Sequence, residues 1–197
     1  TPASYPFGAA DHTRVPEDLA ASGYVEEEFL VGGTANVYDW PAPGPAAIRT
    51  AGVPYVTRVL VRRPAGRDRF SGTVIVEMLN PSNLFDLNLG WAISGRQIVR
   101  SGDAWVGVTA KPVSIATLRA FDATRYAALS MANPLPISDP GNCTTVAADS
   151  ARPTENGLAW DIYTQVGAWL RSRSSSNPLT YRVDASGNYW VAANGYW

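Results

Sequence analysis

The sequence predicts an α/β fold, in which a mostly parallel β-sheet with antiparallel N-terminal strands is flanked by helices. In the second half of the chain, short apolar runs alternate with segments of helical periodicity, and this alternation predicts βαβ units. The earlier strand-like runs are joined by short links, which is typical of antiparallel strands. We expect one domain, with residues 1–22 as an irregular lead-in and residues 23–197 as its folded part.

The first half of the chain carries three strand-like segments. Residues 24–38 are expected to form two strand pieces joined at Gly32-Gly33, and residues 53–63 alternate well enough for one strand. Residues 72–78 include a continuous apolar run, which predicts a central strand covered on both faces.

The second half is expected to contain three helices, another buried strand and a final strand. In the first helix we expect Leu89, Ile93 and Ile98 to form the apolar face, because they recur at helical spacing. The long segment before the last helix has several prolines and is expected to be a loop. The expected helices are residues 87–100, 113–121 and 157–171, and the expected strands are residues 104–110 and 188–193.

Composition excludes several classes of partner. With 16 basic and 17 acidic residues the net charge is -1, which gives no electrostatic reason to expect nucleic acid or an anionic membrane. No apolar run approaches the roughly 20 residues that span a bilayer.

The chain begins Thr1-Pro2-Ala3, and we expect a removed secretory leader and an exported protein.

The single cysteine and the single histidine limit the chemistry. Cys143 is either a buried thiol or half of a disulfide to a partner outside these residues. His12 is expected in an exposed loop, where it is a poor general base for a Ser-His-acid triad. One histidine and one cysteine do not make a metal site, and we expect neither a metal nor a cofactor.

Several segments carry a family resemblance. The run Gly-Thr-Val-Ile-Val-Glu-Met-Leu-Asn-Pro-Ser at residues 72–82 resembles a family of bacterial and fungal α/β-hydrolase-domain proteins. The resemblance covers roughly residues 23–197 and implies that they are the N-terminal portion of a single α/β-hydrolase domain with serine-dependent hydrolysis. Matching segments are residues 33–38, 54–64, 105–112, 121–122, 125–129 and 157–162.

The resemblance also implies where a nucleophile would lie. In the family a final strand leads into a Gly-aromatic-Ser-Gln-type elbow, and Gly195-Tyr196 would begin that elbow here. Either Trp197 occupies the serine position and the site is lost, or the serine is the residue that follows Trp197. We favour the second alternative, and we expect the serine, acid and histidine from a C-terminal segment or second chain that completes the domain.

An oxyanion hole is implied at the loop after the third strand. In this fold that loop provides one of the two backbone N–H donors, and here it contains Leu79 and Asn80, the two expected donors. Pro81 has no N–H and is excluded. The alternative is that Asn80 simply stabilises a turn, and the two roles are compatible.

Other polar and aromatic residues are expected in lesser roles. Glu77 lies in an apolar strand, so we expect an arginine partner rather than catalysis. Asp161 is expected to face solvent or to support a site residue. Lys111 is expected to be exposed without a function, and the alternative is that it lines the rim of a substrate cleft. Trp91 and Trp197 could line an apolar acyl pocket. Glu26, Glu27 and Glu28 are expected on a solvated strand face.

Together these features predict a serine-dependent hydrolase of carboxylic esters, acting on a small-molecule or polymer ester. The alternative is a non-catalytic binding or interaction module on a degenerate hydrolase scaffold, because fold alone does not fix function.

Overall fold

The computed structural model describes most of the chain. The described residues are 4, 6–8, 18–40, 43–139, 142, 153–180, 182–183 and 189–190. His12, Cys143 and the expected elbow residues Gly195, Tyr196 and Trp197 lie outside them, so the predictions about these residues stay predictions.

Strands and helices alternate along the described residues, which confirms the α/β class. No helix in this part of the chain is long and apolar enough to cross a membrane. The strands are β1 (Tyr24–Asp39), β2 (Ala47–Pro64), β3 (Val74–Met78), β4 (Ala104–Val108), β5 (Arg182–Val183) and β6 (Tyr189–Trp190). The α-helices are α1 (Leu89–Ser101), α2 (Val113–Phe121) and α3 (Ala159–Arg171), and the 3-10 helices are η2 (Ala20–Ser22) and η3 (Arg67–Arg69).

Among the described residues, four strands form the main sheet in the order β1-β2-β4-β3. The pairs β1–β2 and β2–β4 are antiparallel, so the predicted antiparallel N-terminal strands are confirmed. The pair β3–β4 is parallel because α1 returns the chain to the start of β4. The described sheet is therefore less parallel than predicted, since β4 lies between β3 and the antiparallel β2.

The glycine pair in β1 does not divide that strand, so the prediction of two pieces was wrong. Pairing with β2 runs in one register from Tyr24 to Ala35, and shifts occur only beyond Ala35. A Cβ atom on Gly33 would lie 2.9 Å from the hydroxyl oxygen of Tyr55. Gly33 is thus explained by the close approach of a neighbouring side chain and not by a turn.

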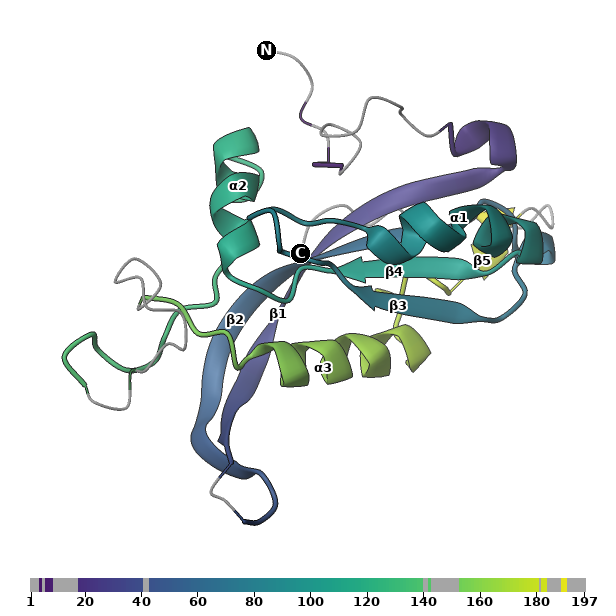
Figure 1. The fold of residues 1–197 in the computed structure, drawn as a ribbon. Coiled ribbons are helices and arrows are strands. Elements are labelled where there is room, and N and C mark those ends of the chain that lie inside the picture. The colour runs from purple at the N-terminus through teal and green to yellow at the C-terminus, as the bar shows by residue number, and fades with distance from the viewer. Residues whose placement is uncertain are drawn as a thin grey trace.

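Helices cover both faces of the sheet, with α1 on one side and α3 on the other (Figure 1). The α1 side is packed with Leu60, Leu79, Trp91, Ile98 and Trp105. The larger core contains the α3 residues Ile162, Val166 and Leu170.

The apolar face predicted for α1 was partly wrong. Ile98 is buried, but Leu89 and Ile93 are 44% and 85% exposed. Trp91 is the large side chain that α1 places against the sheet, and it leaves Ile93 on the solvent side.

β3 is an outer strand in the described sheet, and not the central strand predicted. Ile75 is 38% exposed, and no described strand pairs with the far edge of β3. The described part of the predicted final strand is β6, which pairs antiparallel with β5 in a separate two-stranded sheet.

Candidate active site

The carboxyl ends of β3 and β4 lie side by side, because Met78 pairs with Val108 in parallel register. The loop at residues 79–88 leaves β3, and Thr109 leaves β4 at the same edge. In open α/β sheets, ligands bind beyond the carboxyl ends of the strands. This edge is therefore the candidate active site.

The loop at residues 79–88 is closed by its own hydrogen bonds. Asn80 and Leu87 exchange two backbone hydrogen bonds of 2.9 Å each. The Asn80 side-chain oxygen accepts a hydrogen bond from the Ser82 N–H (2.8 Å), so the predicted turn role of Asn80 is confirmed. Leu84 has a φ of 66°, a left-handed conformation that costs a non-glycine residue on the order of 1 kcal/mol or more.

Both predicted oxyanion donors already have acceptors. The Leu79 N–H donates to the Val108 carbonyl (3.0 Å), and the Asn80 N–H donates to the Leu87 carbonyl (2.9 Å). An oxyanion role for either group would require the loop to change conformation. The assignment of Leu79 and Asn80 stays a prediction.

A buried ion pair holds the loop to the sheet. Asp86, in the loop, accepts a hydrogen bond from the Arg58 guanidinium of β2 (3.1 Å) and another from the Thr109 hydroxyl. The Arg58 and Asp86 side chains are only 1% and 2% exposed. Burial lowers the pKa of Arg58, but the charges of Asp86 and Glu28 outweigh it, so the pKa of Arg58 is raised and the guanidinium stays charged.

Glu28 is the second carboxylate of this network. It accepts from Arg58 Nε (2.6 Å), from Arg125 Nε and from the Tyr126 hydroxyl (2.8 Å). The Tyr126 hydroxyl oxygen in turn accepts from the Phe7 N–H (2.7 Å). Burial is the main cause that raises the pKa of Tyr126 to about 12. The phenol therefore stays protonated and can donate to Glu28 at neutral pH.

The prediction that three consecutive glutamates form a solvated face was wrong. Each carboxylate pairs with an arginine of β2 across the antiparallel ladder. The pairs are Glu26–Arg62, Glu27–Arg63 and Glu28–Arg58, with shortest N–O distances of 2.7, 2.7 and 2.6 Å. The arginines of β2 are the signal that could have identified these partners from the sequence.

A comparison with known protein families shows which family the chain belongs to. The family described as "Alpha/beta hydrolase domain" matches residues 1–188. The chain belongs to this alpha/beta hydrolase domain family. The resemblance and the fold prediction are thereby confirmed, and the match supports a hydrolase in general. No curated protein and no solved structure gave a match.

Glu77 of this hydrolase domain accepts hydrogen bonds from three N–H groups, so the expected arginine partner was wrong. The donors are the backbone N–H groups of Gly90 (2.7 Å) and Trp91 (3.1 Å) and the indole N–H of Trp105 (2.8 Å). The first two belong to the first turn of α1, where a carboxylate interacts favourably with the helix dipole. Glu77 thus fixes the start of the helix that follows the loop.

Two other predicted residues have structural roles. Asp161 accepts from the Asn36 N–H and the Tyr38 hydroxyl, both at 2.8 Å, so it ties α3 to β1. Trp91 is 2% exposed and contacts the Trp105 ring at 5.5 Å between centroids, which places it in the core and not in an acyl pocket.

Lys111, expected to be exposed, is half-buried, and its Nζ donates to the Asn156 carbonyl (3.4 Å). It follows β4 at the same edge as Thr109. In the part of the chain that the structure describes, no group of three or more His, Cys, Asp or Glu side chains could hold a metal ion.

Sequence reasoning missed Arg58, Asp86 and Thr109. One signal was available, because a charged residue within the apolar half of β2 must be paired to be buried. The sequence could not identify Asp86 as that partner, since the two residues meet only when the loop folds back over the sheet.

Proposed function

We propose that this hydrolase domain belongs to a serine-dependent hydrolase of carboxylic esters. The observation that carries the proposal is the family match over residues 1–188. It is supported by the position of the loop at residues 79–88, beyond the carboxyl ends of β3 and β4. The substrate would be a small-molecule or polymer ester, with its acyl group transferred to the serine and then to water.

The catalytic groups would come from polypeptide outside the described residues. A triad needs a histidine as general base, and His12 is the only histidine in these 197 residues. We propose that Gly195-Tyr196 leads into the nucleophile elbow, and that a continuation or second chain beyond Trp197 supplies the serine, acid and histidine. That segment would complete the domain and is the proposed partner of this chain.

The loop at residues 79–88 would contribute to the oxyanion hole. A preorganised N–H donor lowers the barrier to acyl transfer by about 3 kcal/mol. For Leu79 or Asn80 to donate to an oxyanion, its present bond to Val108 or Leu87 must open. Asp86, which is bonded to Arg58 and Thr109, would then hold the far end of the loop to the sheet while its first residues move.

One observation favours a second candidate function. Because the N–H groups of Leu79 and Asn80 are already bonded, the described loop is also consistent with a non-catalytic binding module. In that case the scaffold would carry no serine that reacts with acylating reagents.

Labelling with a serine-directed fluorophosphonate separates the two functions. The full-length protein is treated with the reagent, and the modified peptide is identified by mass spectrometry. The enzyme proposal expects one labelled serine, hydrolysis of p-nitrophenyl esters and loss of both signals on heat denaturation. A Ser82→Ala variant is the matched control, since it removes the loop serine and should still be labelled. No labelling of the native protein would contradict the enzyme proposal and favour the binding module.

A further inference from the structure

The outer edge of β1 has main-chain groups directed away from the sheet. The Arg58 carbonyl accepts a hydrogen bond from the Thr109 N–H (3.0 Å), so the N–H and C=O groups of Arg58 point away from β1. Val56 exchanges two 2.9 Å hydrogen bonds with Ser130 and is turned away as well. In an antiparallel ladder, a residue opposite one whose N–H and C=O point away also directs its own N–H and C=O away from the partner strand. Leu30 and Gly32, which oppose Arg58 and Val56, therefore face outward.

Further along β1, helix α3 covers this outer edge. The Asn36 N–H donates to the Asp161 carboxylate, and the Thr34 carbonyl accepts from the Gln165 side chain, both at 2.8 Å. Asp161 and Gln165 are one helical turn apart, and Asn36 and Thr34 are two strand residues apart. The steps match, since four helical residues rise about 6.0 Å and two strand residues about 6.7 Å.

The next step of this series places Trp169 beside Gly32. Trp169 has only one polar group, the indole N–H, and that group donates to the Ser176 hydroxyl (3.1 Å). It has no acceptor for the Gly32 N–H. Within the described residues, no hydrogen bond reaches the outward main-chain groups of Leu30 or Gly32.

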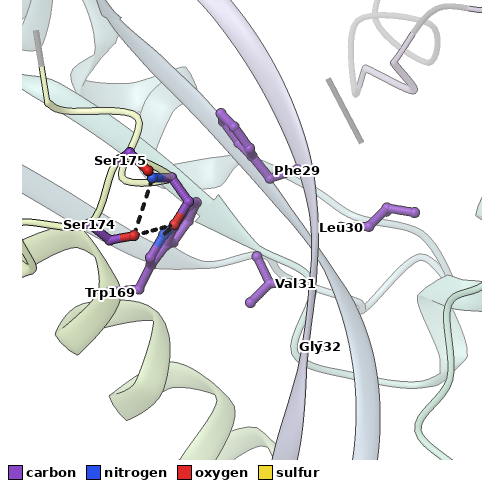
Figure 2. Close-up of a pocket in the computed structure, with 8 residues that line it drawn as sticks. Phe29, Leu30, Val31, Gly32, Trp169, Ser174 and Ser175 are labelled. Atoms are coloured by element: carbon purple, nitrogen blue, oxygen red, sulfur yellow. Dashed lines mark hydrogen bonds between the residues drawn. The ribbon is translucent and has the colours of Figure 1, made fainter. Parts of the chain in front are cut away.

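A cavity of about 340 Å³ lies at this point of the edge (Figure 2). Its apolar wall includes Phe29 and Trp169, whose rings meet edge to face with centroids 5.5 Å apart. In Figure 2, Val31 also projects to the Trp169 side of β1, while Leu30 projects to the other side. The polar wall is the turn at residues 174–176, in which the Ser174 and Ser176 hydroxyls form a hydrogen bond with each other.

We propose that this cavity binds an extended peptide, which pairs with Leu30 and Gly32 as an added β-strand. Unpaired N–H and C=O groups at a sheet edge are a template for such pairing, and an adjacent pocket supplies side-chain selectivity. An aromatic or branched apolar side chain fits the wall formed by Phe29 and Trp169. Arg171 and Arg173 are exposed and come directly before the serine turn, so acidic neighbours in the peptide are favoured.

A single extended peptide fits this edge better than a second copy of the chain. The cavity lies between this edge of β1 and the turn at residues 174–176. Ser174 and Ser175 of that turn are exposed. A second copy of the chain would bring its own turn at residues 174–176 to the same edge. A free peptide carries no such turn. The proposal is independent of the proposed ester hydrolysis.

The test measures binding of a fluorescein-labelled, end-blocked peptide, Glu-Val-Glu-Phe-Glu-Val-Glu, to the full chain by fluorescence anisotropy. Two derivatives are N-methylated, one at the apolar residues and one at the glutamates. Alternate amides of a strand point to opposite sides, so only one derivative loses the donors that face β1. We expect that derivative to bind about ten-fold or more weakly, and the other to keep its affinity.

A matched pair of protein variants tests the same contact from the other side. Gly32→Pro removes the outward N–H, and proline is tolerated on an edge strand where that N–H faces solvent. Gly32→Ala keeps the N–H, and its Cβ would lie 3.5 Å from the Tyr55 carbonyl oxygen, an ordinary contact. We expect Gly32→Pro to weaken peptide binding about ten-fold and Gly32→Ala to preserve it.

Three results would overturn the proposal. They are the absence of saturable binding to the wild-type chain, equal binding of the two N-methylated peptides, and a peptide-independent dimer that Gly32→Pro abolishes. If Gly32→Pro fails to fold, the two N-methylated peptides still decide the question on the wild-type chain.

Discussion

The Asp86 carboxylate connects the candidate active-site loop to the sheet, and we predict that Asp86→Asn destabilises the domain. The change removes the charge of one of the two buried carboxylates, Glu28 and Asp86, that bind Arg58. The volume of the side chain at position 86 stays nearly the same. Weakening a buried ion pair from one side costs roughly 3 kcal/mol. The free energy of unfolding in urea is the measurement, and Asp68→Asn is the matched control because Asp68 is exposed. A loss no larger than that of the control would contradict a stabilising role for Asp86.

Tyr126 gives this network a distinctive pH dependence at high pH. Its folded-state pKa is raised to about 12, above the unfolded value near 10, so folding favours the protonated phenol. The stabilisation is present below pH 10 and is lost as the pH rises towards 12. We predict that the tyrosinate absorbance titrations of wild type and Tyr126→Phe differ by a component with a pKa near 12. A difference centred near 10 would refute this prediction.

At the scale of elements, the start of α1 depends on the contact between Glu77 and Gly90. A Cβ atom on Gly90 would lie 2.7 Å from Glu77 Oε2 and would displace a carboxylate that three N–H groups hold. Gly167, inside α3, has nothing within 4 Å of its Cβ position. Replacing glycine by alanine inside a helix normally stabilises by roughly 1 kcal/mol. We predict that Gly167→Ala shows this gain in thermal unfolding and that Gly90→Ala does not.

Glu77→Gln tests the charge separately. It keeps an acceptor for the Gly90 N–H and removes the charge next to the helix N-terminus, so we expect a loss of about 1 kcal/mol in the free energy of unfolding. Hydrogen exchange of the Gly90 and Trp91 amides should become faster. Unchanged exchange at both amides would show that the carboxylate does not stabilise the first turn.

The elements themselves were largely predictable from local patterns, but their neighbours were not. The bounds of α2 and the position of β4 follow from periodicity and apolar runs, and the structure has both as predicted. The buried face of α1 was mispredicted because Trp91, seven residues before Ile98, packs against the sheet in place of Ile93. In the candidate site, Asn80 was recognisable as a turn residue, whereas the pairing of Asp86 with Arg58 depends on a contact across 28 residues of sequence.

At the scale of the whole molecule, the N-terminal segment is part of the core and not only a lead-in. Phe7 is 2% exposed, and its ring contacts those of Phe85 and Phe121 at centroid distances of 6.2 and 5.3 Å. Its carbonyl accepts from the Arg58 guanidinium, and its N–H donates to the Tyr126 hydroxyl. One residue thus joins β2, the loop after β3, the end of α2 and the segment that follows it.

We therefore predict that Phe7→Ala destabilises the whole domain, although the residue lies outside every helix and strand. Removing a buried phenylalanine side chain costs about 3–5 kcal/mol through lost burial and the cavity that remains. The backbone bonds to Arg58 and Tyr126 would persist only if the segment stays docked. Ile93→Ala is the control, because Ile93 is 85% exposed and its truncation should change the free energy of unfolding by less than about 0.5 kcal/mol. Urea unfolding followed by tryptophan fluorescence compares the two variants, and equal stability would mean that the N-terminal segment does not contribute to the core.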